Sequence, residues 1–102
     1  MTKPTLTAYV YDKRGRLLAK ENNSYTQTHP VQYKYANLVG EPARIFLHAE
    51  IAALLKSIKH GKPFRIVVER YDRQGLSKCA KPCAACARAI KAFGVKRIEY
   101  TL

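Results

Sequence analysis

Four short segments of the chain are rich in β-branched and aromatic residues or alternate between apolar and polar positions. This is the pattern of half-buried β-strands. The segments cover residues 5–11, 16–20, 64–70 and 95–101. Residues 12–15 separate the first two segments and end in glycine, which is typical of a tight turn. The pattern therefore predicts a hairpin and two later strands, and the β-branched centre of residues 64–70 favours a central place in the sheet.

Residues 48–59 have the spacing of an amphipathic helix. Their apolar side chains recur at i, i+3, i+4 and i+7 and form one stripe, which consists of Ile51, Leu54, Leu55 and Ile58. Gly61 follows the last of them and is a typical helix end. We therefore expect one face of this helix to pack against the sheet.

Two other segments also favour helices. Residues 83–93 follow Pro82, a residue well suited to a helix start, and Gly94 ends the segment. Residues 31–38 form a shorter candidate with a weaker pattern. The sequence thus predicts two main helices and one short one.

The order of the main elements is β-β-α-β-α-β, with the short segment 31–38 left aside, and it predicts an α/β fold. A strand–helix–strand crossover joins parallel strands. We therefore expect a mixed four-stranded sheet whose last two strands are parallel and whose two main helices lie on one face. Residues 22–30 and 75–81 are polar and predict loops. A chain of 102 residues suits a single domain covering residues 1–102.

The composition is that of a folded protein, with 47% hydrophobic and 25% charged residues. No apolar run has the length of a membrane span and no signal peptide is recognisable, so we expect a cytoplasmic location and no membrane partner. The 19 basic residues exceed the 7 acidic ones, give a net charge of +12, and are spread along the chain. Such a surface favours phosphate-bearing partners, either a nucleotide or a single-stranded nucleic acid.

Candidate metal ligands stand at the beginnings of the two main helices. His48 and Glu50 begin one, and Cys83 and Cys86 begin the other in a Pro-Cys-x-x-Cys sequence. Zinc accepts imidazole and thiolate ligands, and catalytic zinc sites have three protein ligands and an open fourth position. The two cysteines are one helical turn apart, and a helix N-terminus favours thiolate. We expect one Zn²⁺ per chain, bound by His48, Cys83 and Cys86.

The pattern H-x-E followed by P-C-x-x-C is the signature of the zinc-dependent deaminases. Over most of its length the chain resembles the cytidine deaminase-like superfamily, as a minimal member of the short, basic type that phages encode. The resemblance implies conversion of cytosine to uracil in a phosphate-bearing cytidine, free or within a single strand. It implies that Glu50 transfers protons during this hydrolysis. Deamination of adenine or guanine is the alternative.

The resemblance also indicates where the substrate lies. An asparagine near the end of the second strand commonly contacts the sugar in this superfamily, and Asn23 or its neighbour Asn22 occupies that place. Tyr25 and His29, in the following loop, are candidates for stacking on the base, and ordinary exposed loop residues are the alternative. Two further candidate contacts flank the metal ligands: Ala49 and Lys81.

The cysteines allow two other interpretations. A C-x-x-C pair can be redox-active, although that leaves His48 and Glu50 unexplained. A basic nucleic-acid-binding module could instead use zinc structurally, which normally requires four protein ligands. Cys79, four residues before Cys83, is the candidate fourth ligand of such a site.

Familiar members of the superfamily continue past the fourth strand into another helix and strand, whereas this sequence ends at Leu102. We therefore expect a pocket that is unusually open or that a neighbouring subunit completes. The exposed edge of the last strand and the small core both favour a homo-oligomer.

Overall fold

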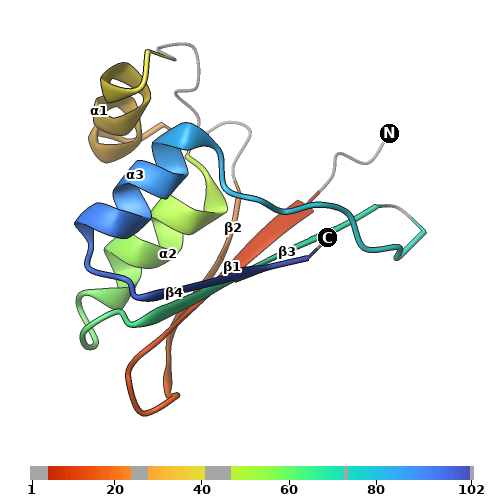
Figure 1. Ribbon diagram of the computed structural model, residues 1–102, viewed down its shortest axis with the longest axis horizontal. Coiled ribbons are helices and arrows are strands. Elements are labelled where there is room, and N and C mark those ends of the chain that lie inside the picture. Colours follow the sequence, from red (N-terminus) through yellow and green to blue (C-terminus); the bar gives the residue numbers. More distant parts are fainter. Residues whose placement is uncertain (1–4, 24–27, 41–46, 73, 102) are drawn as a thin grey trace.

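The computed structural model describes residues 5–23, 28–40, 47–72 and 74–101. Figure 1 shows how the elements are arranged. In chain order the elements are β1 (Thr5–Tyr11), β2 (Leu17–Asn22), α1 (Pro30–Leu38), α2 (Ala49–Ser57), β3 (Arg65–Tyr71), α3 (Ala84–Ala92) and β4 (Arg97–Tyr100). The short segment that the predicted order left aside is therefore a true helix, α1.

The strands form one mixed sheet in the order β2-β1-β3-β4. β1 pairs with β2 and with β3 in antiparallel fashion, and β3 pairs with β4 in parallel. The predicted hairpin, the central place of β3 and the parallel last pair are all confirmed. The hairpin turn is stabilised by Asp12, whose Oδ1 accepts hydrogen bonds from the backbone N–H groups of Arg14 and Arg16, each at 2.9 Å.

Several predicted boundaries were wrong by one or two residues. β2 begins at Leu17 and continues to Asn22, where the loop prediction began. The strand extends because Thr7 and Asn22 remain paired across the hairpin, and the Thr7 hydroxyl donates to Asn22 Oδ1 at 2.9 Å. At the other edge, β4 is only four residues long and starts at Arg97.

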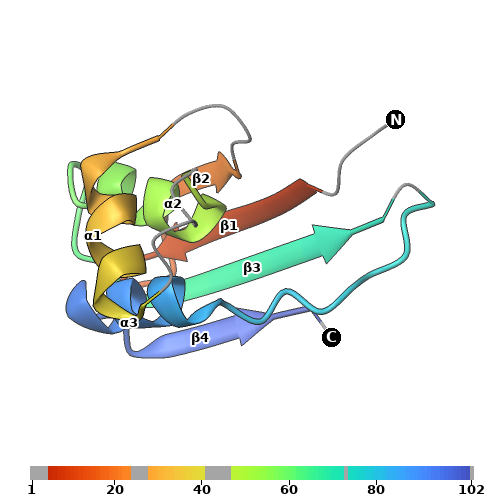
Figure 2. The same cartoon turned by 90° about the horizontal axis from the view of Figure 1, so that it is seen from above.

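The helices lie together on one side of the sheet, as Figure 1 shows. Seen from above in Figure 2, α2 lies over β1 and β2, which it contacts, and α3 lies beside α2. α1 packs against α3. No helix in the described part of the chain is long and apolar enough to cross a membrane.

The core lies between the sheet and the helices α2 and α3. From the sheet it takes alternate residues, among them Ala8, Val10, Ile66 and Val68, all fully buried. The helices contribute larger aliphatic side chains together with alanines, which let the two helices approach closely. This packing fixes the N-termini of α2 and α3 next to each other, where the predicted metal ligands lie.

Candidate active site

His48 and Cys83 occupy equivalent places, each as the N-cap residue of its helix. His48 precedes α2 and Cys83 precedes α3, so both helices begin one residue later than predicted. Both residues have extended backbone, with φ −79° and ψ 154° for His48 and φ −67° and ψ 170° for Cys83. Neither side chain caps its own helix. The helix starts therefore direct an imidazole and a thiol toward one another.

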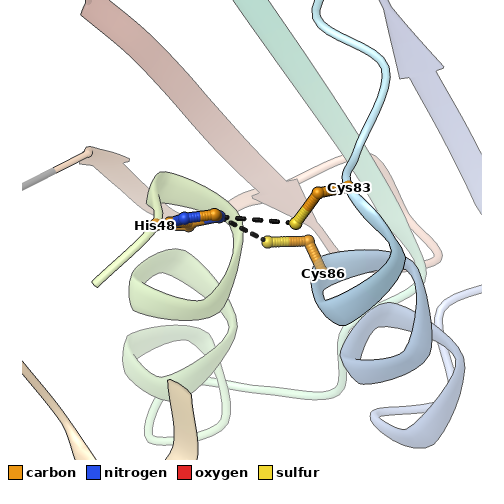
Figure 3. Close-up of side chains that lie close together, drawn as sticks. All are labelled: His48, Cys83 and Cys86. Carbon is orange, nitrogen blue, oxygen red and sulfur yellow. Dashed lines mark hydrogen bonds between the residues drawn. The ribbon is translucent and has the colours of Figure 1, made fainter. Parts of the chain in front are cut away.

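Cys86 completes a cluster of three ligand atoms, which Figure 3 shows in close-up. His48 Nδ1 lies 3.2 Å from Cys86 Sγ and 3.6 Å from Cys83 Sγ, and all three ligand atoms lie within 4.8 Å of one another. Nitrogen and sulfur ligands about 2.0–2.3 Å from a tetrahedral zinc ion are separated by roughly 3.5–3.8 Å. The donor set and its spacing therefore fit one Zn²⁺ ion.

The ligand cluster is only partly buried. Cys86 is buried, whereas His48 and Cys83 are each half-buried. A closed structural site normally surrounds its zinc with four protein ligands. Cys79 is exposed and, among the residues that the structure describes, does not belong to the cluster. Among the described residues the geometry thus presents three ligands, two of which keep part of their surface exposed.

Gln32 supports this arrangement, and the sequence analysis missed it. Its side chain lies on α1 and is fully buried, and its Oε1 accepts a hydrogen bond from the His48 backbone N–H at 3.2 Å. The bond satisfies one of the amides that a helix start leaves without an intrahelical partner. α1 therefore holds the N-terminus of α2 in place. The weak pattern of residues 31–38 carried no signal for this contact.

Glu50 lies in the first turn of α2 and is almost entirely buried, with 4% of its surface exposed. Burial raises the pKa of its carboxyl group, and a hydrogen bond to its own backbone, the charge of His48 and a hydrogen bond with Cys86 partly oppose that shift. Burying a carboxyl group costs free energy unless the group is hydrogen-bonded, paired with a charge or neutralised. The buried carboxyl group of Glu50 lies beside the ligand cluster.

The pKa values of the two cysteine thiols are shifted in opposite directions. A hydrogen bond from Cys86, assisted by His48, lowers the pKa of Cys83 to about 3. The same hydrogen bond to Cys83, together with burial, raises the pKa of Cys86. Hydrogen bonding thus favours the thiolate form of Cys83 and the thiol form of Cys86. Binding of a metal ion to both sulfurs would release the second proton.

The two predicted sugar contacts lie on different sides of the sheet. Glu21 faces the helices, because it forms an ion pair with Lys56 of α2 at 3.1 Å. Strand alternation then places Asn22 on the opposite face, away from the metal ligands. Asn23 follows on the helix side, and its Oδ1 accepts a hydrogen bond from the Leu6 backbone N–H at 2.9 Å. Of the two asparagines, Asn23 is thus the one on the side of the site.

The other predicted contacts are placed as follows. His29 is the N-cap of α1, and its Nδ1 accepts a hydrogen bond from the Val31 N–H at 3.1 Å. Ala49 is fully buried directly after the ligand His48, and Lys81 is exposed two residues before Cys83. Tyr25 lies outside the described residues.

The fold and the site together define an α/β protein with a three-ligand metal centre between two helix N-termini. The family model described as "Cytidine and deoxycytidylate deaminase zinc-binding region" matches residues 1–102. The chain therefore belongs to this family, and the family implies a nucleotide or nucleic-acid substrate. None of the curated proteins with which the chain was compared matches it.

Proposed function

We propose that the chain is a hydrolytic deaminase that converts cytosine to uracil in a phosphate-bearing cytidine, either as (d)CMP or within a single strand. The observation that carries the proposal is the buried carboxyl of Glu50 beside the three-ligand cluster. A structural zinc site is complete with four protein ligands and does not require a further carboxyl group beside it. The family model and the net charge of +12 support a phosphate-bearing substrate.

His48, Cys83 and Cys86 would hold the zinc ion. When bound, zinc acts as a Lewis acid that lowers the pKa of water and so makes it a nucleophile near neutral pH. Glu50 accepts a proton from the water that attacks C4 of cytosine. It gives that proton to the ring nitrogen, then takes up the second proton of the added oxygen and passes it to the departing amine. A C–O bond forms, the C–N bond breaks, and ammonia leaves.

Other side chains position the substrate in this proposal. Asn23, on the helix side of the sheet, would contact the sugar, with Tyr25 and His29 as further candidates, whereas Asn22 faces away from the site. Ala49 would line the base pocket next to His48. Lys81, which is exposed near Cys83, would face a phosphate. We further propose that residues 1–102 act as one catalytic domain in the cytoplasm, with self-association through the edge of β4.

A substrate panel tests the proposal. Zinc-loaded protein is incubated with cytidine, dCMP, a cytosine-containing single strand, and adenine and guanine nucleotides, and ammonia release is measured. We expect release from dCMP or from the strand at a higher kcat/KM than from cytidine. Release from adenine or guanine nucleotides alone would show that the base is wrong. No release from any base would favour a binding module with a structural zinc.

A further inference from the structure

A second feature lies at the ends of α2 and α3 farthest from the metal ligands. Three turns meet there, between β1 and β2, between α2 and β3, and between α3 and β4, as Figure 1 shows. They enclose a hollow of about 420 Å³, which we call the basic hollow. Five cationic side chains line it: Lys13, Arg14, Arg16, Lys62 and Lys96.

Backbone hydrogen bonds hold the three turns together at Phe64, which also lines the basic hollow. The Phe64 N–H donates to the carbonyl of Tyr11 at 2.9 Å. The Phe64 carbonyl accepts from the N–H groups of Lys96 at 2.8 Å and Arg97 at 3.1 Å. The cations that line the hollow are therefore carried by connected, hydrogen-bonded turns.

Close packing also shapes this region at Gly61. A Cβ atom added there would lie 2.9 Å from Leu18 Cδ2, closer than real carbon contacts. Glycine therefore allows the segment after α2 to lie close against the Leu18 side chain of β2.

The positive charge of the basic hollow is mostly unneutralised. Its lining includes one carboxylate, Asp12, which is engaged within its own turn and forms an ion pair with Arg16 Nε at 2.8 Å. Among the residues that the structure describes, no ion pair involves Lys13, Arg14, Lys62 or Lys96. Four cations around one hollow create a field that attracts a polyanion.

The wall of the basic hollow is apolar as well as charged. Pro63 and Phe64 line it; Pro63 is buried, whereas Phe64 is half-buried, so part of the Phe64 surface remains accessible. Aromatic rings with cations around them are the combination that binds single strands, because bases stack on the ring while the cations contact phosphates. An inorganic anion would make no favourable contact with the apolar wall.

We propose that the basic hollow binds single-stranded nucleic acid, with an unpaired base on Phe64 and the neighbouring phosphates on the four cations. The nine-residue helices α2 and α3 separate it from the metal ligands by about 14 Å. The surface is therefore distinct from the site of deamination, and its test does not require that the proposed activity exist.

The test is binding of oligo(dT) of about 15 nucleotides to the zinc-loaded protein over a series of salt concentrations. Thymine lacks the amine that a deaminase removes. The double variant Arg14→Gln/Lys62→Gln removes two cations of the hollow. Its matched control, Arg88→Gln/Lys91→Gln, removes two exposed cations of α3. Each phosphate contact on a single strand contributes about 0.7 to the slope of log K against log salt.

We expect the hollow variant to lower this slope by about 1.4 relative to the wild type, while the control changes it little. Phe64→Leu should weaken binding by about fivefold or more without changing the slope. Thermal unfolding checks that each variant is folded. Equal slopes for the hollow variant and the wild type would overturn the proposal. An equal decrease of the slope in the control variant would also overturn it. Displacement of the strand by dTMP at the same molar concentration would do so as well.

Discussion

Replacing Glu50 with glutamine separates the chemistry of the site from its architecture. The two side chains have nearly the same shape, and Glu50 is only 4% exposed, so its volume matters to the packing around it. Volume-conserving changes in a packed interior usually cost less than about 1.5 kcal/mol. The variant should therefore fold and bind zinc, because His48, Cys83 and Cys86 remain unchanged.

The catalytic loss should be much larger than this structural cost. General acid–base catalysis by a positioned side chain contributes about 10²–10⁴-fold to the rate. A loss of that size corresponds to about 2.7–5.4 kcal/mol of transition-state stabilisation. Glutamine can accept a hydrogen bond from water but cannot take up its proton, so kcat should fall by this factor while KM changes little.

Three measurements on Glu50→Gln decide the point: ammonia release from the best substrate, zinc per chain, and the midpoint of thermal unfolding. The matched control is Glu99→Gln, because Glu99 is 54% exposed and pairs with Arg65 on β3 at 3.0 Å. We expect the control to keep the wild-type kcat. A Glu50→Gln protein with full zinc and more than a tenth of the wild-type kcat would refute the assigned role. Loss of zinc would show instead that Glu50 maintains the ligand geometry.

Further predictions concern the metal and the fold. Zinc at a hundred times its Kd should stabilise the protein by about 2.7 kcal/mol, or roughly 11–22 °C in Tm. Cys86→Ser should abolish that shift and Cys79→Ser should not; loss of the shift in both variants would indicate a fourth ligand. Leu54→Ala, at a fully buried position, should cost about 2–5 kcal/mol in urea unfolding, and a cost under about 1 kcal/mol would contradict the packing of α2. A backbone hydrogen bond from Arg16 lowers the pKa of Asp12 in the folded protein below its value in the unfolded chain. The ionised carboxylate therefore stabilises the fold at any pH above the unfolded-state pKa. This stabilisation is lost as the pH falls through the lower, folded-state pKa. Asp12→Asn should therefore be less stable than the wild type near neutral pH and equal to it in strong acid, and a pH-independent difference would be inconsistent with this.

The metal site was predictable from the sequence because its signals are local. His48 and Cys83 stand where apolar periodicity begins, and a helix start is where a side chain can point away from its own helix. Cys86 follows at one helical turn. The turn at residues 12–15, the β-branched centre of β3 and the final β-α-β order were sufficient for the hairpin, the central place of β3 and the parallel last pair, whereas the pairing of β1 with β3 was not predicted.

The supporting contacts were not predictable because they depend on tertiary packing. Gln32 is a polar residue in a weakly patterned helix, and only the packing of α1 brings it to the His48 amide. The face of Asn22 depends on strand register, and the hairpin register shifts between Val10 and Tyr11. The capping role of His29 also escaped the sequence, because histidine is not a preferred N-cap residue.

The central claim is an open zinc site with three protein ligands, and X-ray absorption at the zinc edge of the full chain tests it most directly. We predict two sulfur ligands at about 2.3 Å, one imidazole nitrogen at about 2.0–2.1 Å, and one further light-atom ligand that is not supplied by the protein. A third sulfur in the coordination sphere would contradict the account, because Cys79 would then close the site.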